Sequence, residues 1–391
     1  MFIQRASIAG FRSIVHSTIG KCGKVNVLYG ENNAGKSNVL AALETLFKVE
    51  KVEELESRVG GFIRGELSNF VDNFTLGTNV KRGNIIKITA QVGLDDNDLV
   101  RMPKFDAFIK ANGIFKRGHN QWVVVEVEVE STGHALARRT VRKAVVNNHV
   151  MFDFESSDRY FPNLKVDSKT RLDAGEEVFS CLINSFAIIR AERFLRNEKV
   201  EDEALYPLLQ NGYFKRFLLE LSLSREPRFK VFEEIVKNIS AKPFNFGQIR
   251  PVVEDGNVEL LVKDSQGREL MVARVGTGVQ QIIVLVSHIA SSSARIIGIE
   301  EIELNLSPSL QYRLLELLKD MVGKSPNVID QLFITSHSYH LSMREDVCLY
   351  AVAKNDTGET NVSWGPAAVS GLRKHFDFGL FKLPRTRSWR S

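Results

Sequence analysis

The chain of 391 residues has the composition of an ordinary folded protein, with 43% hydrophobic and 25% charged residues. It contains no run of 18 apolar residues, and its first residues lack the layout of a secretion signal. The three cysteines are isolated in the sequence, which suits a reducing cytoplasm. The net charge of +5 (52 basic minus 47 acidic residues) only weakly indicates a nucleic-acid partner. We therefore expect a cytoplasmic protein without a membrane span.

The first elements form a strand, a turn, a second strand and a helix. Residues 2–9 alternate between apolar and polar, and the sequence Gly-Phe-Arg-Ser follows at 10–13. Residues 25–29 form a short apolar run that predicts a buried strand. After residue 37, apolar residues recur at three and four positions through Phe47, which predicts a helix. Residues 51–82 predict a loop with a short helix.

The connection between the second strand and this helix has the sequence GENNAGKS, residues 30–37, and fits the pattern G-x-x-x-x-G-K-[ST]. Gly30 and Gly35 allow the backbone to curl so that successive N–H groups point into one concavity. These groups and the start of the next helix can hold a phosphate chain, with Lys36 on the β- and γ-phosphates and Ser37 on Mg²⁺. We therefore predict a nucleotide site here.

The middle of the chain predicts a hairpin and then helices. Residues 85–92, 122–131 and 135–146 alternate as strands. A basic cluster at 138–143 could contact DNA, but the glutamates at 126, 128 and 130 could equally pair with it. Residues 171–240 carry three helical patterns. A hairpin over 258–275 and a helix over about 279–292 follow. We expect one α/β body with a helical insertion.

A phosphate loop of this kind requires a carboxylate at the end of a buried strand to hold the Mg²⁺ shell. Two acidic pairs are candidates: Asp95 with Asp96, and Glu300 with Glu301. The first pair ends an alternating strand, whereas the second ends the continuous apolar run of a central parallel strand. We favour Glu300 and Glu301. They follow Lys36 by 264 positions (300 minus 36), a gap typical of ABC-type ATPase heads.

These motifs together resemble the RecF-like and OLD-family ATPases of the ABC group. The resemblance lies in IQRASIAGFRSI, in LYGENNAGKSNVLAAL as Walker A, in RVGTGVQQIIVLVSHIA as the signature, in IIGIEEIELNLSPSLQYRLLELL as Walker B, and in FITSHS as the switch strand. It implies an α/β fold of the ABC type, with a mixed sheet flanked by helices. It also implies ATP and Mg²⁺ as ligands, and a homodimer or larger homo-oligomer that shares its ATP sites.

The resemblance implies a role for each matched position. Catalysis would fall to Glu301, which would activate water, and to His337, which would sense the γ-phosphate. Nucleotide binding would involve Gly30, Asn32, Asn33, Ala34, Gly35, Lys36, Ser37 and Asn38 of one subunit and Gly276, Gly278 and Gln280 of the other. The metal ligands would be Ser37, Glu300 and, as the candidate Q-loop residue, Gln91. A glutamine on an alternating strand can also be an ordinary solvated residue.

The sequence departs from the family pattern after Glu301, where the usual proline and both histidines are absent. Only 54 residues follow His337 (391 minus 337), and no acidic TOPRIM pattern fits there, so we do not expect nuclease activity. We expect an ATPase head in two parts, 1–165 and 251–391, around a helical insertion at 166–250. Its expected function is a slow ATPase of an anti-phage defence or nuclease system that controls a separate effector. The alternative is a RecF-like repair ATPase that binds DNA.

Overall fold

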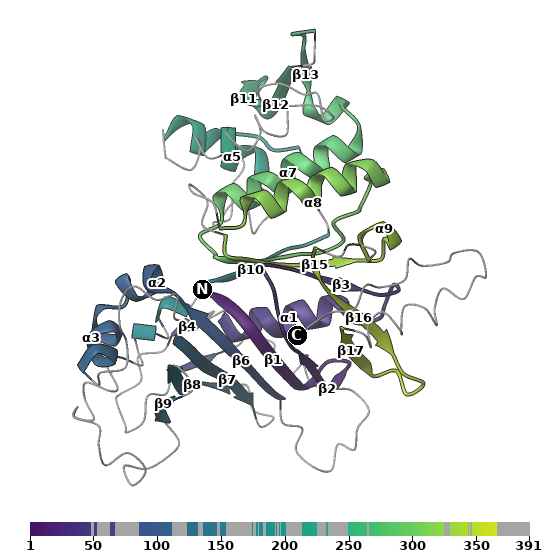
Figure 1. The fold of residues 1–391 in the computed structure, drawn as a ribbon. Helices are drawn as coiled ribbons and strands as arrows, with labels where there is room; N and C mark the ends of the chain where they lie inside the picture. Colours follow the sequence, from purple (N-terminus) through teal and green to yellow (C-terminus); the bar gives the residue numbers. More distant parts are fainter. Residues whose placement is uncertain are drawn as a thin grey trace.

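The computed structural model describes residues 1–47, 51–52, 63–66, 86–111, 123–131, 136–146, 149–153, 213–224, 232–233, 249–263, 266–323, 329–342, 344 and 346–365, together with most residues between 174 and 200. These residues form three sheets with helices between and around them (Figure 1). In the described part of the chain, no helix has the length and apolar character needed to cross a membrane.

A six-stranded sheet forms the centre of the molecule, with the order β10-β14-β15-β3-β16-β17. Its strands are β10 (Phe186–Ile189), β14 (Ile296–Ile299), β15 (Gln331–Ser336), β3 (Val25–Tyr29), β16 (Cys348–Lys354) and β17 (Thr360–Trp364). The first five are parallel to their neighbours, and β17 returns antiparallel. Strands β3, β14 and β15 are buried along their whole length, which explains their continuous apolar sequences.

Helices cover both faces of this sheet, and alternate residues of the strands determine which core each side chain joins (Figure 1). Helix α1 (Lys36–Phe47) packs on one face, where Phe333 of β15 points. Helices α7 (Thr277–Ser291) and α8 (Pro308–Met321) pack on the other face, where Leu332 and Ile334 point. The period of two residues along β15 thus separates two apolar cores.

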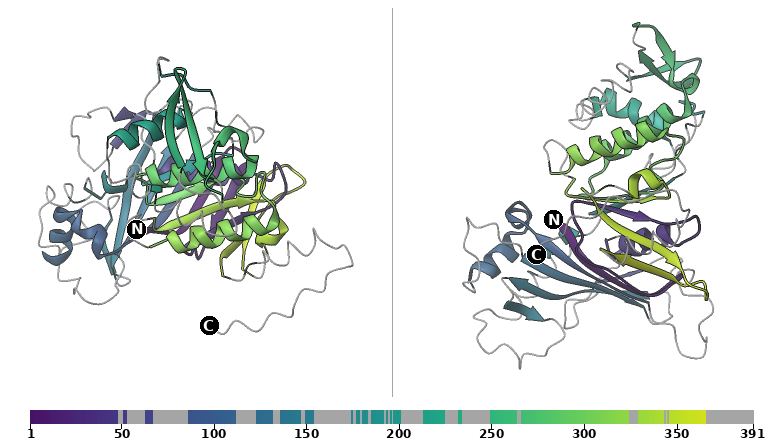
Figure 2. Two further views of the ribbon diagram at one scale, coloured as in Figure 1. Left: turned by 90° about the horizontal axis from the view of Figure 1, so that it is seen from above. Right: turned by 45° about the vertical axis from the view of Figure 1, so that its right-hand side comes forward.

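An antiparallel sheet covers the far side of α1, so that this helix lies between two sheets (Figure 2). Its order is β2-β1-β6-β7-β8-β5-β4, and β9 pairs with β8. The strands are β1 (Phe2–Phe11), β2 (Ile14–Ile19), β4 (Lys51–Val52), β5 (Ile63–Glu66), β6 (Ile86–Leu94), β7 (Val123–Ser131), β8 (Leu136–Val146) and β9 (His149–Asp153). Short helices α2 (Asp96–Val100) and α3 (Pro103–Ala111) follow β6.

The outermost layer lies beyond α7 and α8 (Figure 1). It contains helix α5 (Phe214–Leu223) and a three-stranded sheet of β11 (Ile249–Glu254), β12 (Asn257–Lys263) and β13 (Glu269–Met271). A 3₁₀ turn, η2 (Val272–Arg274), leads from β13 into α7. Helix α9 (Tyr339–Ser342) lies after β15.

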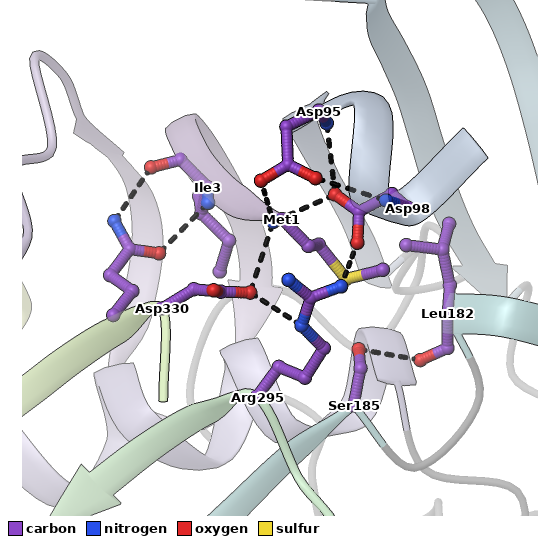
Figure 3. Close-up of polar contacts among 9 residues, drawn as sticks. Met1, Ile3, Asp95, Asp98, Leu182, Ser185, Arg295 and Asp330 are labelled. Carbon is purple, nitrogen blue, oxygen red and sulfur yellow. Dashed lines mark hydrogen bonds and ion pairs between the residues drawn. The ribbon is translucent and has the colours of Figure 1, made fainter. Parts of the chain in front are cut away.

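A buried ionic cluster joins the two large sheets at the start of β1 (Figure 3). The amino group of Met1 lies 2.8 Å from Asp98 and 3.0 Å from Asp330. The Arg295 guanidinium pairs with the same two carboxylates, at 2.6 Å from Asp330. Asp98 is fully buried, and every charge of the cluster faces an opposite charge. This arrangement offsets much of the cost of burying charges.

Most predicted elements are present. The strand and hairpin predictions match β1, β3, β6, β7, β8, β12 and β13, and the helix predictions match α1, α5 and α7. The register of β7 on β8 places Glu126 opposite Lys143 and Glu130 opposite Arg138, as the glutamate alternative required. Two predictions need correction. The range 51–82 contains the strands β4 and β5, and β10 of the central sheet lies within the range 166–250 that we expected to be helical. The basic sequence LPRTRSWRS, residues 383–391, which could be a frayed terminus or a binding arm, lies outside the described residues.

Candidate functional site

The loop of residues 30–37, here called the phosphate loop, connects β3 to α1 at the carboxyl end of the central sheet. Asn33 and Gly35 have φ values of 64° and 101°, so the backbone turns through the left-handed region twice. A Cβ atom at Gly30 would lie 2.1 Å from the Val352 carbonyl oxygen, and one at Gly35 would lie 2.1 Å from Thr360 Oγ1. Both predicted glycines are therefore required by the packing of the loop as well as by its turns.

Lys36 is the first residue of α1 and is only 7% exposed. Its ammonium group donates to the carbonyl oxygens of Gly30 (2.9 Å) and Glu31 (2.8 Å), so it bends back over the loop. Burial lowers the pKa of Lys36, and the nearby carboxylates of Glu303 and Glu301 partly offset this effect. A buried cation above a curled backbone at a helix start fits a phosphate chain, because the phosphate oxygens would replace weak carbonyl acceptors with charged ones.

The last hairpin, β16–β17, forms a wall of the phosphate loop that the sequence did not reveal. Thr360 Oγ1 donates to the Ala34 carbonyl oxygen at 3.0 Å and lies 2.7 Å from Ser13 Oγ. Lys354 donates to the Asn33 side chain at 3.2 Å. The predicted ligand Asn38 donates to the same Ser13 hydroxyl at 2.7 Å. The turn after β1 and the start of β17 therefore meet at this loop.

The predicted acidic pair follows β14, which lies between β10 and β15. The side chain of Glu300 is 10% exposed and accepts a hydrogen bond from Arg190 Nη1 at 3.3 Å. Its backbone N–H donates to the Ile189 carbonyl oxygen at 2.9 Å. Arg190 also contacts Glu44 of α1 at 3.1 Å. Glu300 thus lies where the prediction requires a carboxylate, although its oxygens bind an arginine in this structure.

Glu301 adopts an uncommon backbone conformation, with φ at 44°. Its N–H donates to Thr335 Oγ1 at 3.0 Å, and its carbonyl oxygen accepts from Arg193 Nη2 at 2.7 Å. The same Arg193 nitrogen donates to the Glu300 carbonyl oxygen at 2.9 Å. Burial lowers the pKa of Arg193 to about 10, and Glu303, Glu301 and Glu300 offset part of that shift. The sequence analysis did not identify Arg193.

The predicted switch residue His337 directly follows β15 and pairs with Glu303. One Glu303 oxygen lies 2.9 Å from His337 Nδ1 and accepts the His337 backbone N–H at 2.6 Å. Glu303 is 6% exposed, whereas the His337 side chain is 45% exposed. A buried carboxylate therefore fixes Nδ1 of the imidazole, which leaves Nε2 for another partner. The third acid of the EEIE sequence has a specific role that we did not predict.

The segment 276–280, here called the signature turn, begins α7. Gly276 is exposed, and a Cβ atom there would meet no described atom within 4 Å. At Gly278, by contrast, a Cβ atom would lie 2.8 Å from the Asn305 carbonyl oxygen. Gln280 donates to the Val275 carbonyl oxygen at 3.0 Å and so closes its own turn. Packing explains Gly278 but not Gly276.

Two other candidates lie apart from these groups. Gln91 is in the antiparallel sheet, opposite Arg5 and Glu126, and no contact among the described residues joins it to the phosphate loop. Its role as a metal ligand stays a prediction that gains no support from this position. Asp95, of the rejected acidic pair, caps α2 by accepting from Asp98 N at 2.9 Å. The strand ends at Glu300, Ser336 and Tyr29 instead share the carboxyl edge of the central sheet.

Comparison with known proteins identifies the family and the fold. The family model AAA_15, an AAA ATPase domain, matches residues 1–341. The chain belongs to this ATPase family. An SmcHead bound to the C-winged helix domain of ScpA aligns with 95% of this chain and all of its own chain, with a TM-score of 0.53 and 14% identity. A Pyrococcus furiosus Smc head gives a TM-score of 0.47 at 13% identity, over 96% of this chain and 99% of that chain. No curated protein matches.

The family and the fold establish the expected α/β ATPase of the ABC type and its nucleotide-binding and ATP-hydrolysing activity. Among the described residues, no group of three or more His, Cys, Asp or Glu side chains could hold a metal ion by itself. Mg²⁺ usually binds through one or two carboxylates together with substrate phosphates. The exposed Ser37 hydroxyl at the start of α1 and the Glu300 carboxylate fit that pattern.

Proposed function

We propose that this ATPase is a molecular switch of the RecF/OLD type, in which two copies of the chain close over shared ATP and thereby control a separate effector protein. The main support is the open signature turn. Gly276 is exposed and unexplained by packing within the chain, as a residue would be if another molecule approached it. Helix α7 packs on the opposite face of the central sheet from α1, which carries Lys36.

Each candidate residue has a defined role in this proposal. The phosphate loop and Lys36 bind the triphosphate of one copy, and the start of α7 in the second copy offers its N–H groups to the γ-phosphate. Ser37 and Glu300 hold Mg²⁺, which would neutralise the phosphate charge that develops during hydrolysis. Glu301 orients and deprotonates water. His337, held by Glu303, contacts the γ-phosphate through Nε2.

The shared site is tested by Gly276→Asp, with Gly276→Asn as the matched control. Aspartate and asparagine are both good residues at a helix start, and there is open space for either side chain, so both variants should fold. Only aspartate places a negative charge against the γ-phosphate. In light scattering with Mg²⁺-ATP, we expect the parent and Gly276→Asn to dimerise and Gly276→Asp to stay monomeric, while all three bind ATP. Equal closure in all three would disprove the shared site.

The effector is tested by recovering the tagged protein at native levels from its source cell, as the parent and as Glu301→Gln. A ligand can bias a switch only if its affinity differs between the two states. We therefore expect a second protein, of nuclease or other toxic activity, whose recovery differs between parent and variant. Recovery of only the chain itself and DNA in both samples would favour the DNA-repair role instead.

A further inference from the structure

Three hydrogen bonds, two buried and one partly buried, connect α7 to the turn at Glu300 and Glu301 of the same chain. Gln281, in α7, donates through Nε2 to the Arg193 carbonyl oxygen at 2.7 Å. Arg193 Nη2 then donates to the carbonyl oxygens of Glu300 at 2.9 Å and Glu301 at 2.7 Å. Gln281 and Arg193 are 5% and 4% exposed. The side chains and backbone of these residues thus form one continuous polar path through an apolar core.

The path ends at Glu301, whose backbone conformation, with φ at 44°, is uncommon for a residue other than glycine. The surrounding contacts must hold Glu301 in this conformation. Thr335 holds the N–H of Glu301, and Arg193 holds its carbonyl oxygen. Removal of the guanidinium would leave two carbonyl oxygens without this donor and would free the turn that aims the Glu301 carboxylate.

We propose that Arg193 is a positioning residue for Glu301, and that Gln281 connects this support to the signature turn at the other end of the path. The role of Gln281 rests on the proposed shared site. Binding of a γ-phosphate at the start of α7 would affect the position of Glu301 in the same chain. That Glu301 acts on the second ATP of the dimer. Occupation of one site would thereby set the hydrolytic competence of the other.

The first test compares Arg193→Met with Arg193→Lys. Methionine removes the donors, whereas a lysine ammonium can bridge two carbonyl oxygens as Lys36 does here. We expect Arg193→Met to lower kcat about tenfold or more, the scale of a misplaced catalytic group, with the Kd for a fluorescent ATP analogue unchanged. Arg193→Lys should recover most of the rate. An unchanged kcat, or a parallel loss of ATP binding, would overturn the proposal.

A second buried arginine, Arg295, lies outside the site and serves as a control that distinguishes a positioning role of Arg193 from a purely structural one (Figure 3). Arg295→Met should lower the thermal stability but leave kcat per folded molecule unchanged. Double mutants give the decisive measurement. If Arg193 acts through Glu301, the residual rate of Glu301→Gln should not fall further when Arg193→Met is added. A further tenfold fall would mean that Arg193 acts elsewhere.

The connection to α7 is tested by Gln281→Met, with Ser287→Ala as the control on the same helix. Ser287 is also buried, and its hydroxyl bonds only to Ile283 within the helix among the described residues. We expect a severalfold lower kcat for Gln281→Met and an unchanged kcat for Ser287→Ala. If Arg193→Met does not fold, the comparison of Gln281→Met with Ser287→Ala tests the proposal instead. An unchanged kcat in Gln281→Met would then disprove the connection between α7 and Glu301. Closure is measured by light scattering on other variants, and positioning by the kcat of these variants relative to the parent, so either proposal can fail alone.

Discussion

Lys36 closes the phosphate loop through hydrogen bonds to its backbone. Its ammonium group binds the Gly30 and Glu31 carbonyl oxygens, which are neutral acceptors. Phosphate oxygens carry negative charge, so they add to the hydrogen bond a Coulomb attraction for the ammonium group that the carbonyl oxygens lack. A triphosphate would therefore displace the two carbonyls, and the proximity of Glu303 and Glu301 would place the same cation between the phosphate and the acidic turn.

At this scale we predict opposite phenotypes for two substitutions. Lys36→Ala should abolish ATP binding, because the β- and γ-phosphates lose their charged partner. Glu301→Gln should bind ATP normally but hydrolyse it roughly a hundredfold more slowly, as expected for the loss of a general base. Isothermal titration and a phosphate-release assay measure the two steps. Hydrolysis by Glu301→Gln at the parent rate would transfer the role of base to Glu303 and His337, since Asp95 is occupied in capping α2.

The residues that the sequence predicted and those it did not differ in how far apart their partners lie along the chain. The phosphate loop is a contiguous motif, and its shape follows from eight neighbouring residues. Thr360 contacts Ala34 across 326 positions, and Arg193 contacts Glu300 across 107. No periodicity or spacing rule connects such pairs, because folding alone brings them together. Glu303 could have been suspected from its position in the EEIE sequence, but its pairing with His337 could not.

Among the elements, β10 shows where periodicity and family resemblance disagree. The helical pattern of residues 176–189 extends past Asn184 and Ser185 into FAII, whereas FAIIRAER resembles a strand and turn of the family, and the structure has the strand. A short apolar run of this kind cannot be assigned to helix or strand by periodicity. The strand forms because β14 offers a free parallel edge, to which β10 pairs from Phe186 to Ile189. Strands β3, β14 and β15 were predictable because continuous β-branched and aliphatic runs precede polar motifs at their carboxyl ends.

The buried ionic cluster at the starts of β1, β14 and β15 and in α2 should contribute substantially to stability (Figure 3). Arg295→Met would leave the fully buried Asp98 with fewer positive partners. We expect a loss of about 3 to 5 kcal/mol in the free energy of unfolding, as for other broken buried pairs. Urea denaturation measures it. The exposed pair of Arg250 with Glu269, at 3.3 Å, provides the control, since Arg250→Met should change stability by less than about 1 kcal/mol. Equal losses of unfolding free energy in the two variants would show that the buried ionic cluster is hydrated.

In the whole molecule, the phosphate loop and the signature turn, which are the two halves of the proposed ATP site, begin helices that pack in different apolar cores. Helix α1, with the phosphate loop, lies between the antiparallel sheet and the central sheet (Figure 2). The signature turn belongs to the helical layer on the other face of the central sheet. Under the shared-site proposal, a second copy of the chain supplies its signature turn to the nucleotide on the phosphate loop.

This arrangement predicts complementation between two inactive chains. Lys36→Ala destroys one half of the site, and Gly276→Asp destroys the other. In a mixed dimer, one site carries both defects, while the second combines two intact halves. We expect an equimolar mixture to hydrolyse ATP faster than either variant alone but more slowly than the parent, because only the mixed dimer has a site with two intact halves. The measurement is steady-state phosphate release at several mixing ratios. A mixture no more active than its components would show that each chain works by itself.

The hairpin against the phosphate loop also sets an order of events during synthesis. Residues 30–37 leave the ribosome early, but β16 and β17, which contact Gly30 and Gly35, follow 318 positions later (348 minus 30). At typical translation rates this interval is roughly 20 to 60 seconds. During that time β3, which is buried along its whole length in the finished protein, lacks its neighbours β15 and β16. The nascent chain therefore carries an incomplete nucleotide loop and an unpaired apolar strand, and its ATP site is complete only after β16 and β17 have been synthesised.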